Sequence, residues 1–371
     1  MTGDRMLKGH GGNIYQLARA LNCRPDTIID MSSNVNPLGP MPEMMNFLRE
    51  RIGDITRLPE VNAKGIINLF AGALGVDPEL VMAANGSTWF IHTIPLALET
   101  RRALIIGPTY SDYAAGCRMH NVEHRFWLSR PENGFQPGPQ EINKALSGFD
   151  TIFICNPNNP TGALICRDDI LDLFACHPGV MFVVDEAYLS FVTGGAKSSV
   201  AGCGLPNVVV LNSLSKIFRI PGLRIGFMVS SAPVIQKMAR YALPWCVSSL
   251  AHAAVTWVLT HPATADEFIE KTVQFVTAQR TVVTEGLDLV PDLTVFTSSA
   301  DFILVRLPEG ISAETVCAAL AADRILIRNC GNIKGLSNRF VRISLKTEDV
   351  NRKLVRKLSH ICHTERSAIR H

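Results

Sequence analysis

The sequence lacks the features that mark membrane, secreted or nucleic-acid-binding proteins. No apolar run reaches the roughly 20 residues of a membrane-spanning helix, and residues 1–5 carry no apolar segment of a secretory signal. Charged residues are only 19% of the chain and the net charge is +3, so we expect neither a nucleic-acid nor a membrane partner. The 10 cysteines include no Cys-x-x-Cys pair, so we expect reduced thiols in a cytoplasmic protein. We predict no metal site.

What the chain does contain is the apolar content of a large core. Of its 371 residues, 47% are hydrophobic, which is enough for two domains. Apolar runs that end in polar residues alternate with helical patterns up to about residue 285, which favours an α/β fold. We predict an N-terminal arm that contributes to the smaller domain (residues 1–40), a large domain (41–285) and a smaller C-terminal α+β domain (286–371).

The smaller domain is predicted from a change in pattern after residue 285. Strands and helices alternate there without the long buried runs of the earlier part. We expect strands at 293–296, 302–306, 325–327 and 340–343, and helices near 313–321 and 350–358. The last residues, 361–371, are polar, and we expect them to fray.

One lysine lies between two apolar runs that we interpret as buried strands. A buried ammonium group must be neutralised, paired or bonded, because burying it alone is costly. Lys216 could therefore bond covalently to an aldehyde cofactor, with Ser213, Ser215 and Arg224 on the phosphate of that cofactor. An exposed loop lysine near a strand end explains the same segment equally well.

A second segment has the composition of an anion site. A short strand breaks at Asn85-Gly86, and Ser87 and Thr88 open an apolar helix. Free backbone N–H groups and the helix dipole favour a phosphate at such a helix N-terminus. A simple serine N-cap is the common alternative, but two phosphate-type sites in one chain support each other.

Polar residues follow three further apolar runs, and ligands of open α/β sheets bind outside the carboxyl ends of strands. Tyr110 could stack there on a flat ring. Asp185 could pair with a cation such as a protonated ring nitrogen. Cys155 ends one of these runs, and core packing explains it better than a nucleophilic role, because no setting of His and Asn for it can be inferred.

In combination, these segments resemble the fold-type I enzymes that use pyridoxal 5'-phosphate, the aspartate aminotransferase superfamily. The resemblance covers nearly the whole chain, and it implies a mostly parallel seven-stranded sheet in the large domain and a homodimer. The matching segments are Asn159-Pro160-Thr161-Gly162, Asp185-Glu186-Ala187-Tyr188 and Ser213-Leu214-Ser215-Lys216 with Arg224 eight residues on.

Two families of that group are similar to this sequence. Histidinol-phosphate aminotransferases share the Asn-Asn-Pro-Thr-Gly, Pro-Thr-Tyr and Ser-Lys segments. Threonine-phosphate decarboxylases of cobalamin biosynthesis look closer, because both ends of the chain, which build the substrate side, match them. Their marks are His10-Gly11-Gly12-Asn13, residues 33–39, Ile220-Pro221-Gly222-Leu223-Arg224, Pro244-Trp245 and residues 325–330.

The resemblance implies a role for each candidate residue. The predicted catalytic residues are Lys216, which would bind the cofactor covalently, Asp185, which would pair with its pyridine nitrogen, and Tyr188. Tyr188 and Asn159 would bond the phenolic oxygen of the ring, on which Tyr110 would stack. The residues expected around the cofactor phosphate are Gly86, Ser87, Thr88, Ser213, Ser215 and Arg224. The residues expected to contact a phosphorylated amino acid are His10, Gly11, Asn34, Asn159, Arg328 and Arg342.

Arginine suits bidentate recognition of phosphate and carboxylate. Arg328 and Arg342 are expected at the ends of two strands of the smaller domain, beside a polar turn. A surface arginine paired with an acid is the usual alternative for each of them.

The sequence departs from the family pattern at four positions. Leu58 stands where a tyrosine normally reaches the cofactor phosphate across the dimer interface, and leucine has no donor. Asp301 and Ser248 each replace a usual asparagine, and Arg219 stands where a small residue is common. These departures bear on the substrate and on cofactor affinity.

Three functions therefore stay open. The first is decarboxylation of O-phospho-L-threonine, or of an analogue such as O-phospho-L-serine, to an amino-alcohol O-phosphate for cobalamin biosynthesis. The second is a histidinol-phosphate-type aminotransferase. The third is a non-catalytic cofactor-binding protein, which is disfavoured because Lys216, Asp185, Asn159 and Arg224 are all present.

Overall fold

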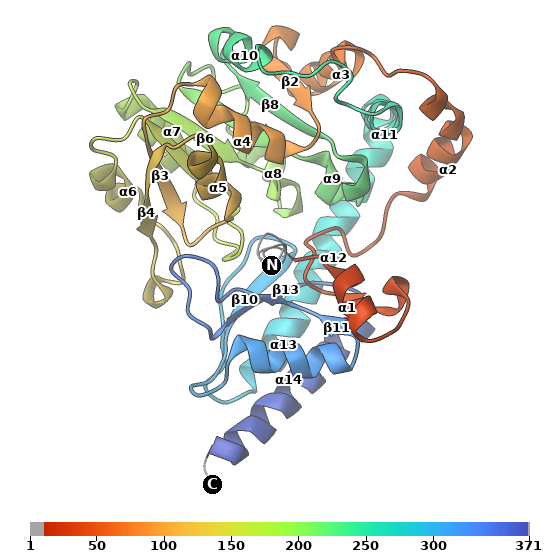
Figure 1. Ribbon diagram of the computed structural model, residues 1–371, viewed down its shortest axis with the longest axis vertical. Helices are drawn as coiled ribbons and strands as arrows, with labels where there is room; N and C mark the ends of the chain where they lie inside the picture. The colour runs from red at the N-terminus through yellow and green to blue at the C-terminus, as the bar shows by residue number, and fades with distance from the viewer. Residues whose placement is uncertain (1–10, 370–371) are drawn as a thin grey trace, which may run out of the picture.

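The computed structural model describes residues 11–369, and its largest element is a seven-stranded sheet (Figure 1). In spatial order its strands are β2 (Val81–Ala84), β8 (Gly226–Ser230), β7 (Val208–Asn212), β6 (Met181–Asp185), β5 (Thr151–Cys155), β3 (Arg102–Gly107) and β4 (Glu123–Leu128). The strands from β4 to β7 are parallel, and β8 is antiparallel to both of its neighbours. The mainly parallel sheet confirms the predicted α/β, fold-type I architecture.

The central strands are apolar throughout because helices cover both faces of the sheet. In β5, Ile152 and Ile154 pack on one face, and Phe153 and Cys155 pack on the other. The helices that contribute to the first face are α3 (Lys64–Leu74), α6 (Pro139–Ala145), α7 (Arg167–Cys176) and α11 (Ser249–Thr260). Those on the second face are α4 (Ser87–Ala97), α5 (Asp112–Met119) and α10 (Ala232–Ala239).

Two smaller sheets lie below the large one in Figure 1. A four-stranded antiparallel sheet has the order β12 (Arg328–Asn329), β13 (Phe340–Ser344), β10 (Phe302–Arg306) and β9 (Thr294–Val295). A parallel pair joins β1 (Ile29–Asp30) to β11 (Ile325–Leu326), so the N-terminal arm is tied to the C-terminal part of the chain. The helices of this region are α1 (Ile14–Ala20), α13 (Ala313–Ala322) and α14 (Glu348–Ile369).

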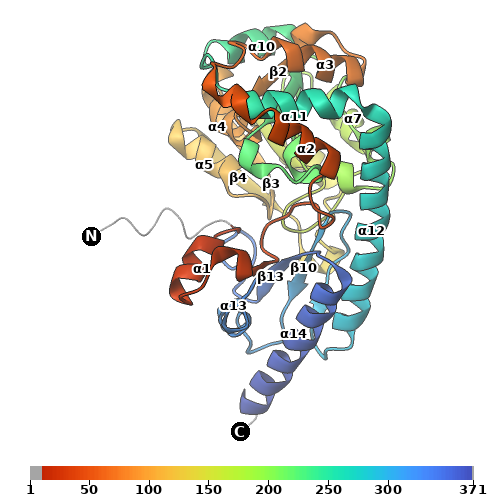
Figure 2. The same ribbon diagram turned by 90° about the vertical axis from the view of Figure 1, so that its right-hand side faces the viewer.

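A single long helix, α12 (Pro262–Asp288), runs beside both the large sheet and the small ones (Figure 2). The predicted domain boundary at residue 285 falls inside the last turn of α12. The remaining α-helices of residues 11–369 are α2 (Pro42–Glu50), α8 (Gly195–Ser198) and α9 (Leu214–Ile217).

The structure differs from the sequence-based expectation in three places. The edge strand β4 was not expected, because its sequence mixes charged and apolar residues. The predicted strand 325–327 is divided between β11 and β12, which belong to different sheets. The expected fraying of the tail is wrong up to residue 369, because α14 continues to Ile369 and buries Cys362 against the core.

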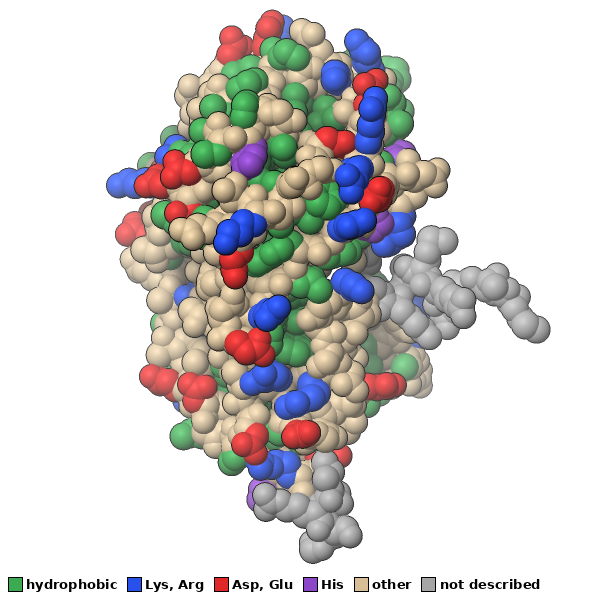
Figure 3. All heavy atoms as spheres, turned by 90° about the vertical axis from the view of Figure 1, so that its left-hand side faces the viewer, with side chains coloured by type: hydrophobic (Ala, Val, Ile, Leu, Met, Phe, Trp, Pro, Cys, Tyr) green, Lys and Arg blue, Asp and Glu red, His purple; other side chains and the backbone are tan. Residues whose placement is uncertain are grey.

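The surface shows no segregation of charge on the face drawn in Figure 3, where basic and acidic side chains are interspersed. Over residues 11–369, we find no helix with both the length and the apolar character to cross a membrane. All ten cysteines are free thiols, as expected.

Candidate functional site

Eight of the predicted site residues line one cavity of about 210 Å³ between the large sheet and the four-stranded sheet. Segments distant in sequence meet here, because the carboxyl ends of β5, β6 and β7 point toward β12 and β13. These eight residues are Gly11, Asn34, Tyr110, Asn159, Tyr188, Lys216, Arg328 and Arg342. His10 lies outside the described residues.

Lys216 lies on the short helix α9, directly after β7, and its side chain faces this cavity. Removal from water lowers the pKa of Lys216. The positive charges of Arg342 and Arg224 act in the same direction, while Asp301 and Asp185 oppose them. The lowered pKa favours the neutral amine, which is the nucleophilic form that reacts with aldehydes.

Asp185 ends β6 and is held by two hydrogen bonds. The hydroxyl of Tyr113 donates to Oδ2 at 2.9 Å, and the backbone N–H of Ala187 donates to Oδ1 at 3.0 Å. Burial raises the pKa of Asp185, whereas both hydrogen bonds and the charge of Lys216 oppose that rise. The sequence offered no signal for the role of Tyr113, because a contact across 72 positions follows only from the packing of α5 on the sheet.

The predicted phosphate cradle is built around a close approach of two chain segments. Gly86 has φ +86°, and a Cβ there would lie 2.5 Å from Nη2 of Arg224. A Cβ on Gly226 would lie 2.3 Å from the backbone nitrogen of Ser87, at the start of α4. The guanidinium of Arg224 therefore lies against the N-terminus of α4, where free N–H groups attract anions.

The hydroxyls predicted around this cradle differ in their surroundings. Ser213 is buried at the N-cap of α9, and Thr88 is half-buried in the first turn of α4. Ser215 is also buried, but its hydroxyl donates to the carbonyl of Ile225 at 3.0 Å. Ser215 thus links α9 to the chain just before β8.

The two predicted substrate arginines face each other across two strands. Arg328, the first residue of β12, and Arg342, in the middle of β13, are direct cross-strand partners. We had expected both at the ends of strands. Arg342 is buried and donates to Oδ1 of Asn159 and to the carbonyl of Ser32, while its Nε has no partner among residues 11–369. Nη2 of Arg328 donates to Oδ1 of Asn332 at 2.8 Å.

A network of amides and hydroxyls completes the wall of the cavity. Nδ2 of Asn34 donates to the hydroxyl of Tyr188 at 3.3 Å, and Ser344 donates to Oδ1 of Asn34. Tyr188 packs edge to face on Phe302, with ring centroids 5.0 Å apart. These contacts orient the Tyr188 hydroxyl toward the segment that contains Asn34.

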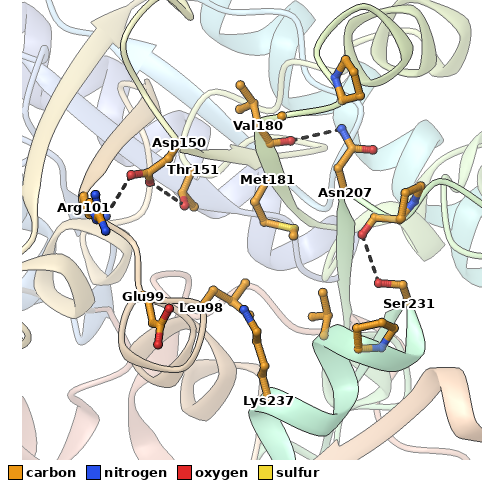
Figure 4. A pocket seen from close by; sticks show the side chains of 15 residues that line it. Leu98, Glu99, Arg101, Asp150, Thr151, Val180, Met181, Asn207, Ser231 and Lys237 are labelled. Carbon is orange, nitrogen blue, oxygen red and sulfur yellow. Dashed lines mark hydrogen bonds between the residues drawn. The ribbon is translucent and has the colours of Figure 1, made fainter.

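A larger cavity of about 530 Å³ lies at the opposite, amino ends of β5 and β6 (Figure 4). One of its two carboxylates, Asp150, accepts hydrogen bonds from the backbone N–H groups of Arg101 and Arg102 and is therefore already paired; the other is Glu99. None of the predicted site residues lines it. The smaller cavity, at the carboxyl ends, is thus the candidate site.

The structure also places four other residues that the sequence singled out. Burial raises the pKa of the Cys155 thiol to about 12, and its Sγ donates to the carbonyl of Pro157, which confirms a packing role. Ser248 accepts from the backbone N–H of Ala251 at 3.2 Å and caps α11. Leu58 is 75% exposed, and Asp301 is fully buried.

Comparison with known proteins gives one matching family and two kinds of relative. The profile of the family "Aminotransferase class I and II" matches residues 26–358. Threonine-phosphate decarboxylase of Salmonella typhimurium is 31% identical over 95% of this chain and 96% of its own length. Histidinol-phosphate aminotransferase of Methanocaldococcus jannaschii is 27% identical over 93% of this chain and 92% of its own length.

A solved structure resembles this one closely over the same region. L-threonine-O-3-phosphate decarboxylase from Porphyromonas gingivalis superimposes with a TM-score of 0.81 at 29% identity. The match covers 91% of this chain and 100% of that one.

The residues in the site fit pyridoxal 5'-phosphate, the cofactor of this family. Lys216 presents an amine to the cavity, and the buried Asp185 lies at the end of the neighbouring strand. The absence of a side chain on Gly86 lets the guanidinium of Arg224 approach the N-terminus of α4, and a guanidinium beside free backbone N–H groups suits a phosphate. The chain belongs to the class I and II aminotransferase family, and it is a pyridoxal-phosphate-dependent enzyme.

Proposed function

We propose that this enzyme decarboxylates O-phospho-L-threonine, or a close analogue such as O-phospho-L-serine, to an amino-alcohol O-phosphate for cobalamin biosynthesis. In this reaction the bond between the α-carbon and the carboxylate breaks, CO₂ leaves, and a proton takes its place on the α-carbon. Likeness to proteins named threonine-phosphate decarboxylase supports the proposal.

The observation that carries the proposal is the pair Arg328 and Arg342. Like charges directly opposite each other on two strands are destabilising, and here they face each other in β12 and β13 on the wall of the cavity. Within the part of the chain that the structure describes, Nε of Arg342 is a buried donor without an acceptor. A ligand with two anionic groups, a phosphate and a carboxylate, would offset both charges and supply that donor with an acceptor.

The chemistry can be assigned to residues of this chain. When bound, pyridoxal phosphate supplies an electron-accepting ring, which stabilises the negative charge left on the α-carbon. Asp185 would hold a proton at the ring nitrogen, with its carboxylate oriented by Tyr113 and Ala187. Arg328 and Arg342 would orient the bond to the carboxylate, since orientation alone can supply several kcal/mol. Lys216 would return the proton to the α-carbon.

Removal of either arginine tests this proposal. Loss of a charge-assisted contact costs about 1.5–3 kcal/mol, so Arg328→Ala and Arg342→Ala should lower kcat/KM for O-phosphothreonine roughly ten- to a hundredfold. The absorbance of the bound cofactor should stay. Arg352→Ala, an exposed arginine of α14, serves as the control. Parental rates in both cavity variants would exclude this substrate.

The histidinol-phosphate-type aminotransferase stays the second candidate. Relatives of that name align over nearly as much of this chain, and a phosphorylated substrate would use the same two arginines. A non-catalytic protein is disfavoured, because the candidate residues converge on one cavity.

We also propose that the enzyme is a homodimer. Apolar side chains are exposed in two neighbouring segments that the N–H of Trp245 joins by donating to the carbonyl of Val61 at 3.0 Å. An exposed apolar patch of this kind favours association with another protein surface. The exposed residues are Ile52, Ile55, Leu58, Val61, Tyr241, Leu243 and Trp245.

The dimer proposal has a matched pair of variants. Leu243→Glu places a charge in this patch, whereas Leu289→Glu changes a leucine elsewhere that is even more exposed. Light scattering should give a dimer for the parent and for Leu289→Glu, and more monomer for Leu243→Glu. A monomeric parent at micromolar concentration would refute the proposal.

Location and domain division can also be proposed. We propose a cytoplasmic location, with which ten free thiols agree. We also propose the division into an arm (1–40), a large domain (41–285) and a small domain (286–371), supported by separate large and small sheets.

A further inference from the structure

Asn36 is a buried amide in the segment 33–39, and none of the predicted roles falls on it. It is 0% exposed. Its backbone N–H donates to the carbonyl of Lys216 at 3.1 Å, and its Nδ2 donates to the carbonyl of Ile217 at 2.7 Å. Two hydrogen bonds thus join the N-terminal arm directly to α9, the short helix that carries the predicted cofactor lysine.

These two bonds satisfy carbonyls that the end of a helix leaves open. The last four carbonyls of any helix lack an intrahelical partner, and α9 has only four residues. The carbonyls of Leu214 and Ser215 accept from backbone N–H groups just after the helix, at 3.1 and 3.0 Å. The carbonyl of Ile217 accepts from Asn36, and that of Lys216 accepts from Asn36 and from a following N–H at 3.3 Å. Asn36 therefore fixes the end of α9 at which the Lys216 side chain begins.

The amide of Asn36 is itself held in one orientation. Its Nδ2 also donates to Oγ1 of Thr272 on α12 at 2.7 Å, and its Oδ1 accepts from the N–H of Leu38 at 2.9 Å. Both N–H donors of the amide and its oxygen are therefore occupied. A buried amide bonded in this way is rigid, so it can define the position of the helix end that it contacts.

Arg219 closes the same contact from the side of α9. Its Nη1 donates to the carbonyl of Asn36 at 3.2 Å and to that of Pro37 at a longer 3.5 Å. Its backbone has φ +50°, a left-handed conformation that is strained for a residue with a side chain. A small residue is common at this position in the families that the sequence resembles. Strain that is retained at a residue gripping the arm points to a role for that grip.

The segment that contains Asn36 also contacts the wall of the cavity. The carbonyl of Ser32 accepts from Arg342, and Nδ2 of Asn34 donates to the hydroxyl of Tyr188. Residues 32–37, which we call the strap, therefore hold a predicted substrate arginine at one end and the lysine segment at the other. The bonds of the strap set how these two groups lie relative to each other.

We propose that Asn36 is a positioning residue for Lys216, and that with Arg219 it clamps the end of α9 to the strap so that the lysine amine stays directed into the cavity. This role rests on Lys216 as the proposed cofactor lysine, and not on which bond of the substrate breaks. Misplacement of reacting groups by about 1 Å lowers rates steeply, so a looser clamp should slow attachment of the cofactor. In this attachment Nζ of Lys216 replaces the aldehyde oxygen, which leaves as water.

The test measures this attachment with the apoenzyme and without substrate. Pyridoxal phosphate is added at a saturating concentration, borohydride stops the reaction after set times, and mass spectrometry of the digest gives the fraction of Lys216 that carries the cofactor. Asn36→Ala removes the side-chain bonds to Ile217 and Thr272. We expect its attachment rate to be about tenfold lower or more.

A matched control is Asn207→Ala. Asn207 is another buried asparagine whose Nδ2 donates to carbonyls, here those of Phe174, His177 and Val180, but it lies at the opposite end of the sheet. Its variant should lose stability in urea, because it also leaves buried carbonyls without a donor. It should attach the cofactor at the parental rate.

Arg219 provides a second test, which separates positioning from stability. Arg219→Gly removes the grip on the arm, but glycine adopts the left-handed backbone without strain. It should therefore unfold at nearly the parental urea concentration and still attach the cofactor about threefold more slowly or worse. Arg219→Lys should restore the parental rate, because both contacts come from the single nitrogen Nη1, which Nζ of a lysine can replace.

Equal attachment rates in Asn36→Ala and Asn207→Ala would overturn the inference. If Asn36→Ala does not fold, the Arg219 variants decide, because a parental rate in Arg219→Gly or a slow rate in Arg219→Lys would also overturn it. A parent that takes up no cofactor at Lys216 would refute it together with the assignment of that lysine. None of these results depends on decarboxylation of O-phosphothreonine, so this inference and the proposed reaction fail separately.

Discussion

The contact between Gly86 and Arg224 offers a sharp test of the phosphate cradle. A Cβ at position 86 would lie 2.5 Å from Nη2 and 3.1 Å from Cζ of Arg224. Because a guanidinium on a flexible stem can move, Gly86→Ala should displace Arg224 and not block folding. The predicted consequence is weaker binding of pyridoxal phosphate.

The magnitude follows from two separate effects. Gly86 has φ +86° and ψ 155°, a region that only glycine populates readily, so alanine there costs about 1–3 kcal/mol of folding stability. Loss of the Arg224 contact with a phosphate costs a further 1.5–3 kcal/mol or so of binding energy. The second effect corresponds to a roughly ten- to hundredfold higher Kd for the cofactor.

The assay is a titration of the apoenzyme with pyridoxal phosphate, followed by absorbance of the bound cofactor. Gly75→Ala is the control, because Gly75 also has a positive φ, +68°, but a Cβ there meets nothing within 4 Å. Gly75→Ala should lose stability and keep its cofactor affinity. If Gly86→Ala binds the cofactor as tightly as Gly75→Ala does, Arg224 does not hold the phosphate.

Three further predictions concern the buried groups of the site. Burial raises the pKa of Asp301 from 3.8 to about 6, so the folded state binds this proton more tightly and loses stability as pH rises through that window. Asp301→Asn should therefore be more stable than the parent by about 3 kcal/mol at pH 7 and nearly equal to it below pH 4, as measured by urea unfolding of the apoenzyme. Tyr113→Phe leaves Asp185 without a donor at Oδ2 and should cost about 1–3 kcal/mol in the same assay at pH 7; an unchanged midpoint would contradict the role of this bond. Borohydride reduction of the holoenzyme should attach the cofactor to Lys216, and an adduct on any other lysine would contradict the assignment.

The large sheet was predictable from sequence because its central strands are buried on both faces. Runs such as Val208–Asn212 are nearly all apolar and end in polar residues, so both their structure and the place of the site follow from the pattern. The edge strand β4 has one exposed side, and its Glu, His and Arg residues interrupt the apolar run from which the other strands were predicted. The tail was misjudged because an amphipathic helix with a narrow buried stripe is polar overall.

The site was predictable to the extent that it uses strand ends and local motifs. Asn159 and Lys216 follow β5 and β7, and Asp185 ends β6 between them, so the sheet brings the three together. The pairing of Arg328 with Arg342 depends on strand register in the small sheet, which short strands specify weakly in sequence. The bond from Tyr113 to Asp185 depends on helix packing, for which a single sequence carries no signal.

Product analysis of a labelled substrate tests directly whether the bond to the carboxylate breaks. The holoenzyme is incubated with O-phospho-L-threonine labelled with ¹³C at the carboxyl carbon, with a keto acid present as amino acceptor. Decarboxylation predicts release of the label as ¹³CO₂ and formation of the amino-alcohol phosphate. Retention of the label in a phosphorylated keto acid, with transfer of the amino group to the acceptor, would contradict it and identify an aminotransferase.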